Sequence, residues 1–385
     1  MSAQKQEIGF DPDALRLKYK AERDKRVRAD GNDQYQEVVG DFAYFVDDPY
    51  IDATLQRGPV EDEIEVAIIG GGFGGMLAAA RLREAGIDDF RVIEKGGDFG
   101  GTWYWNRYPG ASCDIEAYVY FPLLEKTQFT PQQKYTNAAE TLNYCRVIAE
   151  KYDLHANALM QTKVTCTEWD EDSRRWLVKT DRGDAIKARF VVHSNGPLNR
   201  PKLPAISGIT SFKGHTFHTS RWDYGYTGGN SDGGLEGLKD KRVAVIGTGA
   251  TGIQTIQTIA KSVGHLTVFQ RTANWAAPLH NTPISAAEMA EIKANYPQIF
   301  ARCRETPGCF IHMNDPRATF EVSEAERLAF YEELYSKPGF GIWQGNFRDM
   351  STDPEANAAA SEFIAGKIRQ RVKDPALAEK LIPKD

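Results

Sequence analysis

Residues 65–75 read EVAIIGGGFGG, a short apolar run that leads directly into a glycine-rich turn. An apolar run without polar alternation is typical of a parallel strand buried on both faces. The turn fits the pattern GxGxxG through Gly70, Gly72 and Gly75, and a helical pattern follows at 76–85. These glycines allow a tight turn, a close approach of the backbone to a pyrophosphate and close packing of helix on strand. The stretch therefore predicts the start of a dinucleotide-binding βαβ unit, with the phosphates at the helix N-terminus.

The end of the next strand indicates which nucleotide this unit takes. The run 90–94 (FRVIE) reads as the second strand, and it ends in Glu94. An acid at this place accepts the ribose 2′-OH of an unphosphorylated nucleotide and repels a 2′-phosphate. The first unit is therefore predicted to bind FAD or NAD, and not NADPH.

A second βαβ unit begins with the run 242–246 (RVAVI) and continues through GTGATG at 247–252 to a strand at 266–270. Arg271 follows at the same offset from Gly247 as Glu94 from Gly70. An arginine there can hold a 2′-phosphate through two parallel hydrogen bonds, so this unit is predicted to bind NADPH. A lone GxGxxG is a weak signal, but each turn here lies between a strand and a helix.

Composition excludes several other classes of protein. The 385 residues are 41% hydrophobic and 26% charged with a net charge of −6, which predicts a soluble chain without a nucleic-acid partner. No apolar run is long enough for a membrane helix, and the first residues lack a secretory core, so we expect a cytoplasmic protein. The five cysteines lack metal spacing and read as reduced structural thiols. No CxxxxC pair follows the first turn, which argues against a disulfide reductase.

The fold class predicted is α/β, with two Rossmann-like dinucleotide-binding domains, a helical insertion and an N-terminal helical extension. The extension covers 1–60, the first part of the FAD domain 61–200, the first part of the NADP domain 201–280 and the helical insertion 281–385. Within the extension, Asp11-Pro12 reads as an N-cap and first helical residue, and within the FAD domain 190–194 (FVVHS) reads as another buried strand.

Two longer motifs narrow the chemistry. Residues 101–114 read GxWxxxxYPGxxxD, and residues 212–223 read FxGxxxHxxxWD. Both resemble the fingerprints of Baeyer–Villiger monooxygenases, and the order of motifs matches from residue 61 to the end. The related flavin monooxygenases that oxygenate N or S atoms share FxGxxxH, but the ending Trp222-Asp223 favours the Baeyer–Villiger group.

The resemblance implies that FAD and NADPH together use O2 to convert a ketone to an ester or lactone. It implies that Asp114 lies beside the flavin and helps to orient an essential arginine, and that His218 couples NADPH binding to domain movement. Trp222 is expected to pack at the domain junction, where its indole N–H finds a partner. These three residues are the catalytic candidates. Each also has a structural reading: a surface acid, a satisfied histidine and a core tryptophan. Cofactor contacts are predicted at Gly70, Gly72, Phe73, Gly75, Glu94, Gly101, Thr102, Trp103, Asp114, Tyr120, Val164, Gly247, Thr248, Gly249, Ala250, Thr251, Gly252, Arg271 and Thr272.

The chain also departs from the family. It is expected to lack the C-terminal third, including the essential arginine, and Arg348 does not replace that residue. We expect an open sheet edge and uncovered apolar surface as a result. A non-catalytic nucleotide-binding fragment therefore stays open as an alternative. The extension 1–60 and the glycine-rich loop 224–238 resemble the subgroup that accepts bulky or large-ring ketones, although both also read as surface decoration.

Overall fold

The computed structural model describes residues 11–51 and 53–384, and these form two compact units. The smaller unit comprises the chain up to Asp47 together with Arg200–His218, and the larger unit comprises Asp48–Asn199 and the chain from Thr219 onward. This division differs from the domain boundaries expected from the sequence, which remain predictions.

The smaller unit begins with the predicted helix, α1 (Pro12–Arg26). The Asp11 side chain accepts hydrogen bonds from the backbone N–H groups of Asp13 and Ala14, so the predicted N-cap is confirmed. Strand β1 (Tyr35–Gln36) pairs antiparallel with β8 (Leu203–Pro204). The core of this unit contains Val38, Phe42, Phe45 and Leu203.

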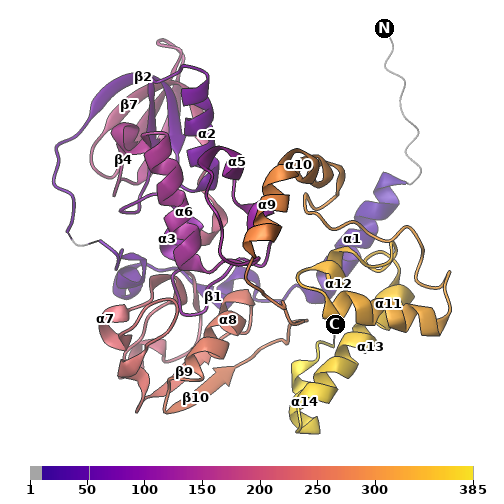
Figure 1. The fold of residues 1–385 in the computed structure, drawn as a ribbon. Helices are drawn as coiled ribbons and strands as arrows, with labels where there is room; N and C mark the ends of the chain where they lie inside the picture. Colours follow the sequence, from indigo (N-terminus) through magenta and orange to yellow (C-terminus); the bar gives the residue numbers. More distant parts are fainter. Residues whose placement is uncertain (1–10, 52, 385) are drawn as a thin grey trace. The chain divides into compact units, whose positions relative to one another are not determined.

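The larger unit contains a six-stranded sheet in the order β4-β3-β2-β7-β6-β5. Its strands are β2 (Glu61–Ile69), β3 (Phe90–Ile93), β4 (Ala158–Leu159), β5 (Val164–Asp170), β6 (Arg175–Thr180) and β7 (Ala185–His193). The first four in the sheet are parallel, whereas β6 and β5 pair antiparallel. Helix α2 (Phe73–Glu84) contacts β2 and β7, and α6 (Ala138–Lys151) lies beside it (Figure 1). The predicted α/β class and first βαβ unit are confirmed.

One strand differs from its prediction. The run 190–194 was expected to be buried, but Phe190 on β7 is 54% exposed and only the earlier residues Ile186 and Ala188 are fully buried. An apolar run identifies a strand, but it does not say whether both faces are covered. Within the described residues, β7 is therefore only partly covered from Phe190 to its end.

The second nucleotide unit has the predicted β–α–β order. Strands β9 (Arg242–Ile246) and β10 (His265–Phe269) pair in parallel, and α8 (Ala250–Ile259) connects them. They form a sheet of two strands, in which Ile246 is 59% and Phe269 is 55% exposed. Uncovered apolar surface, which the sequence predicts, is therefore present in the part of the chain that the structure describes.

The remaining α-helices described in the larger unit are four short ones and those of a helical C-terminal region. The short helices are α3 (Thr102–Trp105), α4 (Ala117–Tyr120), α5 (Leu124–Thr127) and α7 (Tyr224–Thr227). The C-terminal region contains α9 (Ala286–Ala294), α10 (Tyr296–Glu305), α11 (Glu324–Ser336), α12 (Gly341–Gln344), α13 (Pro354–Arg371) and α14 (Pro375–Leu381). None of the helices between residues 11 and 384 combines the length and apolar character that a membrane span requires.

Candidate functional site

The first glycine turn has no room for a side chain at the first and third glycines of its motif. Gly70 has a φ of +106°, and a Cβ there would lie 2.6 Å from the carbonyl oxygen of Ser194. A Cβ on Gly75 would lie 1.9 Å from the carbonyl oxygen of Gly70. The first and third glycines of the motif are therefore required by the backbone itself, as the sequence predicts.

Glu94 is built into this turn. Its side chain is only 5% exposed, and its two oxygens accept hydrogen bonds from the backbone N–H groups of Gly71 (2.6 Å) and Gly96 (2.7 Å). Burial raises the pKa of this carboxyl, and the two N–H donors oppose that shift. A carboxylate has about four acceptor positions, so oxygen lone pairs remain to receive ribose hydroxyls. The arrangement fits an unphosphorylated dinucleotide.

The first fingerprint segment packs directly on the turn. A Cβ on Gly101 would lie 2.7 Å from the Cα of Gly72, so the two motifs meet through two glycines. The indole N–H of Trp103 donates to the hydroxyl of Tyr120 (3.0 Å), whose ring lies 5.6 Å from that of Phe73. The structure therefore brings five predicted contact residues together at one turn.

Two further predicted contacts on the first unit lie at its margins. Thr102 begins α3 beside Gly101, whereas Val164 begins the edge strand β5 and packs against the core of the sheet. The cofactor role of Val164 stays a prediction, since its side chain contacts core residues.

The second glycine turn repeats the geometry of the first. Gly247 has a φ of +106°, and a Cβ on Gly252 would lie 2.3 Å from the carbonyl oxygen of Gly247. No atom lies within 4 Å of a Cβ built on Gly249, so the turn is open where a pyrophosphate would approach. The N-terminus of α8 begins at Ala250.

The far side of this turn carries the residues predicted to select NADPH. The hydroxyl of Thr248 donates to the carbonyl oxygen of Thr272 (3.2 Å), which joins the turn to the chain after β10. Arg271 is exposed and precedes Thr272. A guanidinium at this place fits a 2′-phosphate.

Asp114 is held by a residue that the sequence did not single out. Burial raises the pKa of Asp114, and a hydrogen bond from Gln254 on α8 opposes the shift. The Nε2 of Gln254 lies 3.4 Å from Oδ1 of Asp114. A polar residue on the inner face of the helix after GxGxxG was the available signal, but nothing local names its partner.

The second fingerprint is divided between the two units. His218 is half-buried and ends the smaller unit, so its predicted role stays a prediction. Trp222, in the larger unit, is 4% exposed and donates through its indole N–H to the hydroxyl of Thr227 (3.0 Å). Its backbone N–H donates to the hydroxyl of Tyr50 (3.2 Å). These contacts give Trp222 a structural place, and its predicted catalytic role is untested.

Two arginines, the buried Arg221 and the half-buried Arg107, make cation–π contacts near this fingerprint. The guanidinium of Arg221 lies 3.8 Å from the ring centre of Trp105, and that of Arg107 lies 4.1 Å from the ring centre of Tyr50. Burial lowers the pKa of Arg221 to about 10, so it stays charged at neutral pH. Cation–π contacts therefore supplement the hydrogen bonds around Trp222.

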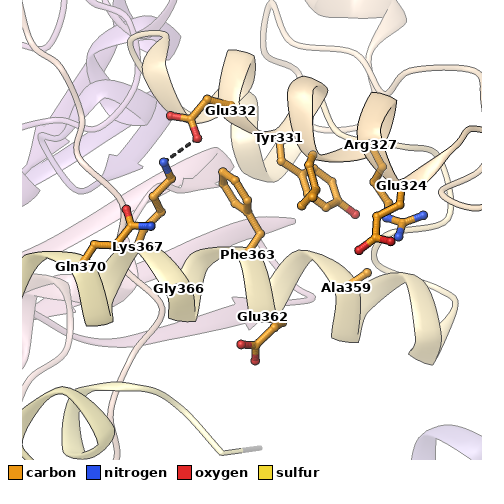
Figure 2. Close-up of a pocket in the computed structure, with 11 residues that line it drawn as sticks. Glu324, Arg327, Tyr331, Glu332, Ala359, Glu362, Phe363, Gly366, Lys367 and Gln370 are labelled. Carbon is orange, nitrogen blue, oxygen red and sulfur yellow. Dashed lines mark hydrogen bonds and ion pairs between the residues drawn. The ribbon is translucent and has the colours of Figure 1, made fainter. Parts of the chain in front are cut away.

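A separate groove of about 460 Å³ lies in the helical C-terminal region, between α11 and α13. Figure 2 shows Phe363 and Tyr331 in this groove and the ion pair between Lys367 and Glu332 at one end. None of the residues predicted from the sequence lines it. The candidate site is therefore the pair of glycine turns and the segments packed on them.

Comparisons with known proteins agree with this geometry. The profile of the pyridine nucleotide-disulphide oxidoreductase family matches residues 67–302. Neopentalenolactone D synthase of Streptomyces avermitilis is 53% identical over 75% of this chain and 48% of its own length. A Baeyer–Villiger monooxygenase of Streptomyces coelicolor is 44% identical over 96% of this chain and 60% of its own length.

Solved structures of monooxygenases with bound nucleotides are also similar to this chain. A structure described as OTEMO in complex with FAD and NADP aligns with a TM-score of 0.79 and 40% identity, over 86% of this chain and 61% of its own. Cyclohexanone monooxygenase from Rhodococcus sp. Phi1 bound to NADP+ aligns with a TM-score of 0.79 and 35% identity, over 85% and 60%. The chain belongs to the pyridine nucleotide-disulphide oxidoreductase family, and over most of its length it is similar to Baeyer–Villiger monooxygenases. It spans about half to three fifths of the length of these relatives.

Proposed function

We propose that the chain forms the FAD- and NADPH-binding part of a Baeyer–Villiger monooxygenase, which uses O2 to convert a ketone to an ester or lactone. The observation that carries this proposal is the chemical difference between two turns of the same geometry. Glu94 is a buried acceptor at the first turn, and Arg271 is an exposed cation at the second. An acid selects FAD over a 2′-phosphorylated nucleotide, and an arginine selects NADPH.

The residues of this chain divide the work of binding. Gly70, Gly72 and Gly75 let the FAD pyrophosphate approach the N-terminus of α2, and Glu94 accepts the ribose hydroxyls. Gly249 leaves the corresponding space open for NADPH at α8. When bound, FAD supplies the redox chemistry with O2, and the protein positions the reactants and excludes water.

We propose a bulky or cyclic ketone as substrate. Support comes from relatives named for neopentalenolactone and pentalenolactone D synthesis, at 53% and 51% identity. The extension 1–60 and the loop 224–238 agree with the same subgroup. The free cysteines fit the cytoplasmic location that the sequence predicts.

The test is product analysis with the whole chain, FAD, NADPH and oxygen, on a cyclic ketone and an aryl sulfide. A lactone with matching NADPH consumption supports the proposal. Sulfoxide without lactone would instead assign an N- or S-oxygenating enzyme. Binding of both nucleotides without NADPH oxidation would assign a nucleotide-binding fragment that needs further polypeptide for turnover.

A further inference from the structure

The helix of the second nucleotide unit lies directly against the first fingerprint. Gly110 has a φ of +85°, and a Cβ there would lie 2.2 Å from the hydroxyl oxygen of Thr258 and 2.5 Å from the carbonyl oxygen of Gln254. Both contacts are on α8. The glycine of the YPG sequence is therefore needed because α8 occupies the space of its side chain.

Gln254 makes the polar contacts across this junction. Its Oε1 accepts from the hydroxyl of Tyr108 (2.8 Å) and from the backbone N–H of Ser112 (3.5 Å). Its Nε2 donates to the backbone oxygen of Ser112 (3.1 Å), to the hydroxyl of Ser112 (3.3 Å) and to Oδ1 of Asp114 (3.4 Å). One amide thus contacts three residues of the fingerprint, Tyr108, Ser112 and Asp114, using both donor and acceptor atoms.

The other end of the same helix faces the second nucleotide site. Gln254 lies five residues beyond the open turn at Gly249 and four residues beyond the helix start at Ala250, which is about 6 Å from that start along the axis. A helix of this length moves as one body. A nucleotide that fixes the N-terminus of α8 therefore also fixes the amide that holds Asp114.

We propose that Gln254 is a positioning residue through which occupancy of the second nucleotide site sets the position of Ser112 and Asp114 at the flavin side. The inference rests on the proposed function, in which both nucleotides bind, and on the expectation from the family resemblance that Asp114 lies beside the flavin. It adds a route by which the two binding sites are coupled. NADP+ fixes the position of α8, and α8 fixes the fingerprint through Gln254, so FAD binds to a site that is already ordered. By linkage, FAD tightens NADP+ by the same factor.

The test measures this coupling and not turnover. FAD is titrated into the whole apoprotein with and without saturating NADP+, and the visible absorption of bound flavin is recorded in both states. We expect NADP+ to tighten FAD binding about fivefold or more and to shift the flavin spectrum. In Gln254→Met, which keeps the volume but removes the hydrogen bonds, the ratio falls to about one and the spectral shift is lost, in line with the disappearance of the coupling free energy.

Two further variants separate positioning from a general packing defect. Gln254→Glu still accepts from Tyr108 but does not donate to Ser112 or Asp114, so it also loses coupling. Gln257→Met is the matched control, because Gln257 lies on α8 with an exposed side chain. It keeps the full ratio. If Gln254→Met does not fold, Tyr108→Phe removes one bond to the same amide and lowers the ratio in part.

The outcomes are distinct. Equal ratios in the unchanged chain and in Gln254→Met, or no coupling in the unchanged chain despite binding of both nucleotides, overturn the inference and leave the proposed function intact. A chain that binds neither nucleotide overturns both.

Discussion

The two glycine turns share one backbone geometry but differ in their surroundings. Gly70 and Gly247 both have a φ of +106°, and both third glycines leave no room for a Cβ. At the first turn the strand ends are buried, with Ile69 9% and Ile93 2% exposed. At the second turn the corresponding Ile246 and Phe269 are 59% and 55% exposed.

This difference shows that the motif sets the turn, and the sheet around it sets how firmly the turn is held. The first unit lies in a six-stranded sheet, and the second in a pair of strands within the described residues. The two residues proposed to select the nucleotides differ in the same way. Glu94 is fixed by two hydrogen bonds in the interior, whereas Arg271 lies on the surface.

The largest expected effect on stability concerns the ion pair between Asp184 and Arg57 at the six-stranded sheet. Asp184 has a fully buried side chain and pairs with Arg57 at 2.6 Å, while also accepting from the backbone N–H of Val60 and the hydroxyl of Thr180. Asp184→Ala leaves Arg57 without its partner and should lower the free energy of unfolding by about 3–5 kcal/mol, measured by urea denaturation. Glu65 is the control, because it pairs with Arg189 at the surface, where its side chain is 39% exposed. Glu65→Ala should lower the free energy of unfolding by less than about 1 kcal/mol.

The same ion pair predicts that the stability of the fold depends on pH. The Arg57 guanidinium, with the other donors, lowers the pKa of Asp184 below its usual value. Because the pKa of Asp184 is lower in the folded than in the unfolded chain, the ionised side chain stabilises the folded state at pH values above its unfolded pKa of about 4. This stabilisation is lost as the pH falls from there towards the folded pKa. Urea midpoints of the unchanged chain should therefore fall in acid more than those of Asp184→Ala. Parallel acid profiles would contradict this role.

The next effect tests Glu94. Glu94→Gln replaces one accepting oxygen by an NH2 group that faces backbone N–H donors, so it should weaken FAD binding about 30-fold, or about 2 kcal/mol. Flavin content after purification and FAD titration measure this. NADP+ affinity measured without FAD is the internal control and should not change. Full flavin content in the variant would remove Glu94 from the site.

A smaller effect is expected at the second turn, because Arg271 is exposed. Arg271→Ala should weaken NADPH binding about tenfold and leave NADH binding nearly unchanged, since only NADPH carries the 2′-phosphate. Titration with both nucleotides measures the ratio. Arg242→Ala, on an exposed residue at the opposite end of β9, is the matched control. Equal weakening of NADPH and NADH would show that Arg271 does not hold the phosphate.

The smallest effect is predicted for the bare face of the second sheet. Phe269→Ser removes a side chain that is already 55% exposed, so the free energy of unfolding should change by less than about 1 kcal/mol. Ile93→Ser, at the same place in the first unit, removes a buried side chain and should cost about 3 kcal/mol or more. Similar losses in both variants would mean that the two units are covered alike.

Much of the site could be predicted because its signals are local. GxGxxG fixes a turn within six residues, and Glu94 and Arg271 follow at the end of the next strand. The bare side of Phe190 was not predictable, since an apolar run looks the same whether one face or two are covered. Gln254 was missed because its partner Asp114 lies 140 positions away.

The sequence alone determined the two turns, the nucleotide that each is predicted to bind and the fingerprint that resembles those of Baeyer–Villiger monooxygenases. Steric limits on φ and the charge of one residue per unit act over short distances, so a linear pattern can carry them. Only the tertiary structure decided that the Glu94 side chain is hydrogen-bonded within its turn and that α8 occupies the space of a side chain at Gly110. It also decided that Gln254, on the helix of the second nucleotide turn, contacts the first fingerprint. These contacts depend on which segments pack together, and packing between segments that are far apart in the chain produces no recognisable pattern in the sequence.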